Sequence, residues 1–199
     1  MNTPSHVILN LVCFTAGERQ ISGGAIPSQR LAIALGAVLP DLPIFLLYGW
    51  AKLVRQQPEA QIWSQTYYLP FWQNAVALLH SIPLAAVAAV IGYAVGWRWL
   101  LFLGISMVMH SLLDLPVHHA DAHRHFFPFS NYRFISPFSY WDVRHYGAIV
   151  SMIERLLVLS GSIYLFPTTP TWWGRSLLIA VNAVYWILYW FWRSQFASG

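Results

Sequence analysis

Long apolar stretches, separated by shorter polar ones, make up most of this sequence. A helix needs about 20 predominantly apolar residues to cross the hydrocarbon core of a bilayer. Five stretches approach that length: residues 31–50, 75–93, 100–116, 148–166 and 176–192. Charged residues account for only 9% of the chain, whereas about a quarter of an ordinary soluble domain is charged. The pattern predicts an all-α, polytopic membrane helix bundle, folded as a single membrane-embedded domain over residues 1–199.

Two features of the sequence affect how many of these stretches can cross a bilayer. Residues 6–16 are apolar but too short to span, and we expect a polar loop to follow over residues 17–29. Pro40 and Pro43 lie in the middle of the 31–50 stretch, and each proline removes a backbone donor and breaks the local helix. We therefore expect four to five spans together with short half-helices.

The charge pattern narrows the possible partners. The net charge is +4, but the eleven basic residues are scattered singly, without a run or a stripe. Nucleic-acid-binding surfaces concentrate lysine and arginine on one face, so we do not expect nucleic acid as a partner. Basic residues beside apolar segments suit contact with anionic lipid headgroups, which makes the lipid bilayer the expected partner. The single cysteine, Cys13, cannot form an internal disulfide.

We single out five ionisable residues that lie inside or at the edge of the apolar stretches. Burying such a side chain at membrane depth costs several kcal/mol, so these residues are usually paired, solvated or metal-bound. All five are histidine or aspartate, which is the ligand chemistry of zinc, manganese and iron. The sequence therefore predicts a divalent metal site, with zinc as the expected ion and manganese as the alternative, held by His6, Asp41, His80, His110 and Asp114.

The spacing of two of these residues is informative. His110 and Asp114 are four residues apart, so both project from one face of a helix. The pair could chelate one ion, its carboxylate could bridge two ions, or the two side chains could simply share an intrahelical hydrogen bond. Asp41 lies between two prolines, where broken backbone is tolerated at membrane depth only against protein or a wet cavity. It either faces that cavity or caps the second half of the helix.

A histidine-rich segment follows Asp114 closely; it contains Asp121 and the four histidines His118, His119, His123 and His125. Such tracts bind metals but also occur as solvated loops, and His118 and His123 are the candidates for further ligands. Residues 126–142 alternate aromatic with small polar side chains, which suits either a lid over a cavity or a plain surface loop. Arg124 and Arg133 would suit an anionic headgroup or a phosphate.

Four short motifs follow one another in a characteristic order: Pro4-Ser5-His6, Leu39-Pro40-Asp41, His80-Ser81 and His110-Ser111-Leu112-Leu113-Asp114. This order resembles that of the LexA-binding, inner-membrane-associated metal-dependent hydrolases. That bacterial family is in turn similar to the zinc-dependent phospholipase C and single-strand nuclease superfamily. The resemblance implies a location in the bacterial inner (cell) membrane, as a multi-pass protein. Family members often carry His-Arg-Gly ahead of the histidine-serine pair, whereas this chain has Ala75-Val76-Ala77.

The resemblance also implies roles for the ligands. His6 and Asp114 would help to hold one ion. The other ion would be held by Asp41, His80, His110 and Asp114, with Asp114 bridging the two. A third metal set of the soluble phospholipases has no clear equivalent, and its candidates here are His118, Asp121 and His123.

These features together predict a membrane-embedded metal-dependent hydrolase that acts on a phosphoester or lipid-linked substrate through metal-activated water. A phospholipid headgroup linkage is the expected target. Asp41 or Asp121 would act as the general base, and the sequence does not choose between them; Arg124 or Arg133 would hold the substrate's charge. Two alternatives stay open: a metal-ion or proton transporter or channel lined by the same residues, and a non-enzymatic membrane scaffold with a structural metal.

Overall fold

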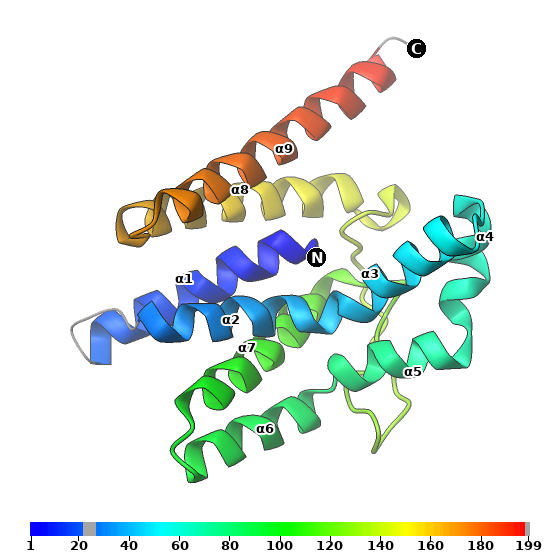
Figure 1. Ribbon diagram of the computed structural model, residues 1–199. Coiled ribbons are helices and arrows are strands. Elements are labelled where there is room, and N and C mark those ends of the chain that lie inside the picture. Colours follow the sequence, from blue (N-terminus) through cyan, green and yellow to red (C-terminus); the bar gives the residue numbers. More distant parts are fainter. Residues whose placement is uncertain (22–26, 198–199) are drawn as a thin grey trace.

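A computed structural model describes the backbone of residues 1–21 and 27–197 and the side chains of residues 1–17 and 29–191. Within these residues the chain forms helices and connecting loops and contains no strand, which confirms the all-α prediction (Figure 1). The α-helices are α1 (Thr3–Ile21), α2 (Pro27–Val38), α3 (Leu42–Gly49), α4 (Glu59–Ser64), α5 (Pro70–Leu79), α6 (Ile82–Ala94), α7 (Arg98–Asp114), α8 (Gly147–Leu165) and α9 (Trp172–Ala197). The short helical turns are η1 (Leu39–Asp41), η2 (Trp50–Val54), η3 (Thr66–Tyr68), η4 (Leu115–Val117), η5 (Val143–His145) and η6 (Phe166–Thr168).

Four helical runs among the described residues are long and apolar enough to cross a membrane. They are Gln29–Val54, Arg98–Val117, Gly147–Thr168 and Trp172–Phe191. The first joins α2, η1, α3 and η2 into one run of 26 residues. α5 and α6 together make a fifth candidate, bent by 40° between its halves. Length and composition therefore confirm the predicted number of four to five potential spans.

The apolar stretch at residues 75–93 is divided at His80 and Ser81. α6 begins after this break with Ser81 as its N-cap, because the Ser81 hydroxyl accepts a hydrogen bond from the Leu84 N–H at 3.2 Å. Pro83 lies in the first turn of α6, where its missing N–H leaves no hydrogen bond to continue α5. Hydrophobicity alone does not predict this break, since the same apolar residues suit a continuous helix and a bent one.

α1 is longer than the half-helix expected over residues 6–16. It continues to Ile21 and so takes up the first part of the predicted loop at 17–29. The physical reason is that residues 18–20 are glutamate, arginine and glutamine, which are polar but favour a helix. The loop prediction also covers residues 22–26, which lie outside the described residues, and residues 27–29, where it is wrong because α2 begins at Pro27, and proline suits the first turn of a helix.

The two prolines beside Asp41 tighten the helix without ending the run. Between α2 and α3 the backbone forms η1, a single 3-10 turn. Pro40 and Pro43 each lie in the first turn of the segment that follows, where a missing N–H costs least. The predicted interruption is confirmed in this form, and it leaves the Asp41 side chain buried against the bundle.

α7 is the central helix of the bundle, with α2 and α6 packed against it and α1 in contact with both α2 and α8 (Figure 1). Glycines allow these backbones to approach closely. A Cβ added to Gly36 of α2 would lie 2.5 Å from the Leu103 carbonyl oxygen of α7, and one added to Gly104 of α7 would lie 2.7 Å from the Ala85 carbonyl oxygen of α6. Close contact at small residues is typical of helices that pack against one another in lipid.

A buried polar link fixes three of these helices against one another. Asn10 of α1 donates through Nδ2 to the Ser106 carbonyl at 2.9 Å and to Ser106 Oγ at 2.8 Å. The Ser106 hydroxyl donates in turn to the Ile33 carbonyl of α2 at 2.6 Å. A shift of one helix would leave these buried groups unpaired at a cost of about 1–3 kcal/mol each, so the link sets the register of α1, α2 and α7.

The close packing of α6 and α7 predicts a large effect of a small substitution. Gly104→Ala should destabilise the protein by about 1–3 kcal/mol, because its Cβ would press on the α6 backbone. Gly49→Ala is the matched control: no atom lies within 4 Å of its added Cβ, and alanine stabilises a helix relative to glycine by about 0.5–1 kcal/mol. Thermal unfolding in detergent micelles measures both. Equal midpoints for the two variants would contradict this account of the packing.

Candidate metal centre

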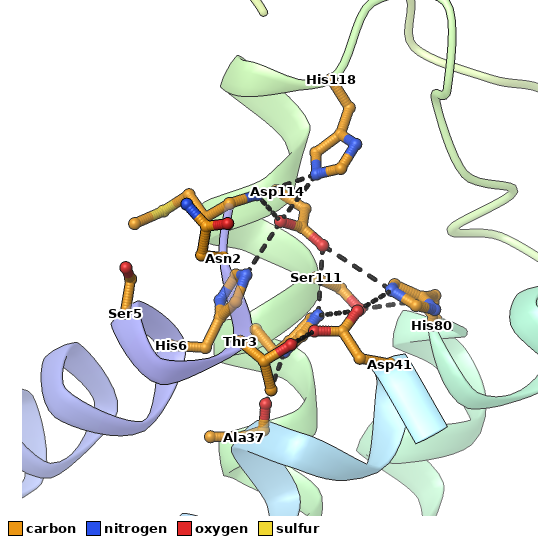
Figure 2. Close-up of polar contacts among 12 residues, drawn as sticks. Asn2, Thr3, Ser5, His6, Ala37, Asp41, His80, Ser111, Asp114 and His118 are labelled. Atoms are coloured by element: carbon orange, nitrogen blue, oxygen red, sulfur yellow. Dashed lines mark hydrogen bonds and ion pairs between the residues drawn. The ribbon is translucent and has the colours of Figure 1, made fainter. Parts of the chain in front are cut away.

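The Asp114 carboxylate lies at the middle of a buried cluster of histidines (Figure 2). Its Oδ1 is 3.0 Å from His6 Nε2 and 3.1 Å from His118 Nε2, and the Met1 nitrogen is 2.7 Å from the same oxygen. Its Oδ2 is 3.1 Å from His110 Nε2 and 3.6 Å from His80 Nε2. The two oxygens of one carboxylate therefore face two different groups of imidazole nitrogens.

Asp41 completes the second of these groups. Its Oδ1 lies 3.6 Å from both His80 Nε2 and His110 Nε2, and its Oδ2 accepts a hydrogen bond from the Thr3 hydroxyl at 2.5 Å. Ligand atoms about 2.1 Å from a tetrahedral zinc ion lie about 3.4 Å from one another. The four separations between these two nitrogens and the two carboxylate oxygens are 3.1–3.6 Å, close to the edge length of that arrangement.

Backbone carbonyls orient the two imidazoles. His110 Nδ1 lies 2.8 Å from the Ala37 carbonyl oxygen, and His80 Nδ1 lies 2.9 Å from the Val76 carbonyl oxygen. A carbonyl only accepts, so each Nδ1 carries the hydrogen of this bond, and each Nε2 is thereby aimed at the carboxylates. An Nε2 lone pair and a carboxylate oxygen 3.1–3.6 Å apart repel each other unless a proton or a cation lies between them.

The hydrogen-bonding state of the same nitrogens supports this conclusion. The Nε2 atoms of His6, His80 and His110 are buried and lie 3.0–3.6 Å from carboxylate oxygens, but none forms a hydrogen bond of good geometry within the described part of the chain. Buried polar atoms are nearly always satisfied in folded proteins. Three buried imidazole nitrogens that face two carboxylates are the donor set of a divalent metal site, and the residues present therefore fit such an ion.

The serine of each histidine-serine pair holds the backbone around the cluster. Ser111 Oγ donates to the His80 carbonyl at 2.8 Å, which ties α7 to the break between α5 and α6. Ser81 caps α6 and also donates to the Phe127 carbonyl, which ties the break to the loop over residues 118–146. Ser111 satisfies the His80 carbonyl that the helix break exposes, and both serines hold the backbone on either side of His80 in place.

Glu154 of α8 holds the beginning of α1, and the sequence analysis missed it. Its Oε1 accepts hydrogen bonds from the Asn2 N–H at 2.9 Å, from Asn2 Nδ2 at 3.0 Å and from the Ser5 hydroxyl at 2.5 Å. Glu154 is only 3% exposed, and a carboxylate at a helix N-terminus is favourable. His6 follows Ser5 directly, so this contact positions it. An acidic residue inside the apolar stretch 148–166 was the signal that could have revealed it.

Two loop histidines extend the cluster. His118 Nδ1 lies 3.0 Å from Asp121 Oδ2, which also accepts from Trp141 Nε1 at 3.1 Å. A carboxylate on the far side of an imidazole is the arrangement that orients metal-binding histidines. The His123 ring packs on the His80 ring, with their centroids 4.1 Å apart.

Burial controls the protonation of two further loop histidines, His123 and His125. It lowers the pKa of the His125 imidazole to about 4. Burial, with neighbouring His80, also lowers the pKa of His123 well below its usual value. Both rings are therefore neutral near pH 7, and a neutral imidazole has the free lone pair that metal binding requires.

The two arginines expected to contact substrate both donate hydrogen bonds to α5. Arg124 donates to the Gln73 carbonyl at 2.8 Å and to Asn74 Oδ1 at 2.7 Å. Arg133 donates to the Ala122 carbonyl at 2.6 Å and to Gln73 Oε1 at 2.8 Å. Their donors tie the loop to α5, and neither side chain lines the cavity beside the cluster.

A cavity of about 580 Å³ opens beside the cluster. Its walls come from the start of α1, from η1 to η3 and from the loop after α7, and they are largely aromatic. The residues that line it are Met1, Asn2, Thr3, Asp41, Ile44, Phe45, Trp63, Tyr67, Tyr68, His118, Ala120, Asp121, His123, Tyr140 and Trp141. Burial raises the pKa of the Tyr67 phenol to about 12, so its hydroxyl stays protonated and able to donate a hydrogen bond.

The structure thus brings seven of the residues singled out in the sequence into one cluster: His6, Asp41, His80, His110, Asp114, His118 and His123. Three overlapping sets among them are buried and could each hold a metal ion, namely His6 with His110 and Asp114, Asp41 with His80 and His110, and His80 with Asp114 and His123. Comparisons with models of known families, with curated proteins and with solved structures found no match to this chain. The function must therefore be argued from this geometry.

The cluster predicts a metal content that depends on Asp114. Purified protein should retain about one or two zinc or manganese ions per chain, and Asp114→Ala should lose them, because both groups of nitrogens share this carboxylate. Glu59→Gln, which removes an exposed carboxylate paired with Lys52, should retain the wild-type content. Elemental analysis after gel filtration measures the ratio. Metal-free wild-type protein, even after reconstitution, would show that the imidazoles are held together by protons.

Glu154 predicts a coupling between stability and metal affinity. Glu154→Ala leaves three donors without their acceptor and should cost at least about 2–3 kcal/mol. It should also weaken metal binding, because the first turn of α1 carries His6. Glu154→Gln keeps an acceptor oxygen and should lie between alanine and wild type in thermal midpoint and in metal affinity. An unchanged affinity in Glu154→Ala would mean that His6 does not depend on this contact.

Proposed function

We propose that this chain is an integral protein of the bacterial inner membrane that uses a zinc or manganese centre to hydrolyse a phosphoester in a lipid or lipid-linked substrate. One observation carries the proposal. The two oxygens of Asp114 face two groups of imidazole nitrogens, beside a cavity of about 580 Å³. Pairs of metal ions about 3.5–4 Å apart are common in enzymes that cleave phosphoesters.

The apolar surface supports insertion in a membrane. Within Trp172–Phe191, Leu178 is the one residue that is buried within the protein. Along it Leu177 and Ile187 are each 66% exposed and Ile179 is 60% exposed. A contiguous apolar surface of this extent is unfavourable in water, but it is the ordinary surface of a helix in lipid.

Aromatic residues mark one edge of the proposed membrane region. Trp97 and Trp99 begin α7, and Trp172 and Trp173 begin α9; all four are exposed. Tryptophan concentrates at the boundary between hydrocarbon and headgroups. Asp114 lies sixteen residues beyond Arg98 on α7, or about 24 Å from this edge at 1.5 Å per residue. The centre would therefore lie nearer the opposite surface, which the 118–146 loop covers.

The chain's own residues prepare the centre for an ion. Hydrogen bonds to the Val76 and Ala37 carbonyls aim His80 Nε2 and His110 Nε2 at the carboxylates. The Thr3 hydroxyl holds Asp41 Oδ2, so its Oδ1 faces the imidazoles. When bound, a divalent ion lowers the pKa of a coordinated water and polarises a phosphoryl oxygen.

Asp121 is the better placed of the two candidate proton acceptors. Both oxygens of Asp41 are engaged, one by Thr3 and the other by the imidazoles. Asp121 lines the cavity, and its Oδ1 is buried without a hydrogen-bond partner among the described residues. We therefore assign proton transfer to Asp121 and metal binding to Asp41.

The aromatic walls of the cavity would exclude water and accommodate the apolar part of a substrate. Phe45, Tyr67, Tyr140 and Trp141 line it, and a site that excludes water strengthens the electrostatic interactions inside it. Arg124 and Arg133 act in this scheme by holding the loop on α5. The metal centre would carry the positive charge that faces a phosphate.

Hydrolysis is tested directly on a panel of substrates. Protein loaded with zinc or manganese should release product from phospholipid or lipid-linked phosphoesters, and Asp114→Ala and His110→Ala should each lower kcat/KM by at least about a hundredfold, since even changes beside a metal ligand cost about 10–100-fold. Glu59→Gln should retain full activity. No turnover by loaded protein on any phosphoester or amide substrate would overturn the proposal.

The same preparation separates the two remaining candidate functions. A transporter would move zinc or protons across liposome membranes and lose that movement in His110→Ala, without hydrolysis. A scaffold would lose thermal stability on chelation and show neither turnover nor transport.

A further inference from the structure

A second space lies among the helices, between α1, α2 and the first part of α9. It has a volume of about 820 Å³, and apolar side chains at helical spacing form its walls. Its walls include Val7 of α1, Ala34 of α2, Phe45 of α3, and Leu177 and Val181 of α9. Among the residues that line it, Arg30 is the single charged one. We refer to this space as the apolar groove.

The apolar groove adjoins the cavity beside the metal centre and shares part of its wall. Asn2, Thr3 and Phe45 line both spaces. The Thr3 hydroxyl also donates a hydrogen bond to Asp41. The end of the groove at Thr3 therefore lies next to the cluster. A molecule with a polar head in the cavity could therefore extend an apolar tail into the groove.

Arg30 closes the far end of the apolar groove. Its Nη1 donates to the Thr168 carbonyl at 2.7 Å and so connects α2 to η6. Arg30 and Phe45 are fifteen residues apart on one helical run, which is about 22 Å at 1.5 Å per residue. One leaflet of hydrocarbon is about 15 Å thick, half of a core of about 30 Å, so an extended hydrocarbon chain has room here.

The apolar walls of the groove favour a hydrocarbon chain over a peptide or water. A peptide would leave its backbone N–H and C=O groups unpaired against apolar side chains, which costs several kcal/mol per group. Water does not fill a large cavity that offers few polar partners. Leu177, on one wall, is 66% exposed, so this wall reaches the outer surface of the bundle, where hydrocarbon chains would surround it in a bilayer.

We propose that the apolar groove binds one acyl chain of a membrane lipid whose polar head lies in the cavity beside the metal centre. The catalytic meaning of this site rests on the proposed hydrolase function, but the binding itself does not require turnover. The substrate would then be an acylated lipid that reaches the metal centre from within the membrane, along the groove between α1, α2 and α9.

The test uses the full-length protein in phosphatidylethanolamine vesicles that contain a phosphatidylglycerol with a photoactivatable diazirine on one acyl chain. Peptide mass spectrometry should locate cross-links on the groove faces of α1, α2 and α9. Ala34→Trp fills the groove and should lower this labelling by about tenfold, equivalent to about 1.4 kcal/mol. Leu35→Trp, the next residue on α2, lies outside the groove, is 38% exposed and should label as wild type does.

Val181→Trp repeats the test from the α9 wall, with exposed Val184→Trp as its control, in case Ala34→Trp does not fold. Equal labelling of the groove and control variants, with cross-links spread over all exposed faces, would reduce the site to ordinary boundary lipid and overturn the proposal. Groove-specific labelling without turnover would support the acyl-chain site and count against the hydrolase. Turnover without groove-specific labelling would do the reverse.

Discussion

A carboxylate held at the centre of an apolar bundle is the constraint on which the rest of this structure depends. Asp114 is 1% exposed, and an ionised group removed from water must be paired to be tolerated. Besides the Met1 amino group, its partners are four imidazoles: His6 on α1, His80 at the break between α5 and α6, His110 one turn earlier on α7, and His118 in the following loop. One buried charge thereby connects segments that are far apart along the chain.

Helix packing and site chemistry are coupled through the same contacts. Gly36 and Gly104 let α2 and α6 approach the α7 backbone, and that approach allows the Ala37 carbonyl to reach His110 Nδ1. The Asn10–Ser106 link fixes α1 beside α7. This position of α1 places His6 in contact with Asp114. Loosening the packing would therefore change the direction of the imidazoles before it unfolded the helices.

The parts of the site that sequence reasoning could predict are those set by local geometry. The four-residue spacing puts His110 and Asp114 on one face whatever surrounds the helix, and the prolines beside Asp41 force a local turn. Glu154 was missed because one acidic residue among apolar ones gives no spacing to interpret. The residue type of Arg124 and Arg133 suggested an anionic partner, but nothing in the sequence indicated their position, and in the structure both donate to Gln73 of α5.

The sequence by itself determined that the chain is helical, that several helices are apolar enough for a bilayer, and that histidine and aspartate are the polar groups placed among them. Periodicity and composition carry this information because both act over a few turns of helix. Only the tertiary structure decided that these side chains meet, which oxygen of Asp114 faces which imidazole, and that an apolar groove runs from this point between α1, α2 and α9. Those outcomes depend on helix rotation and register, which are set by contacts between residues far apart in the sequence and leave no local pattern.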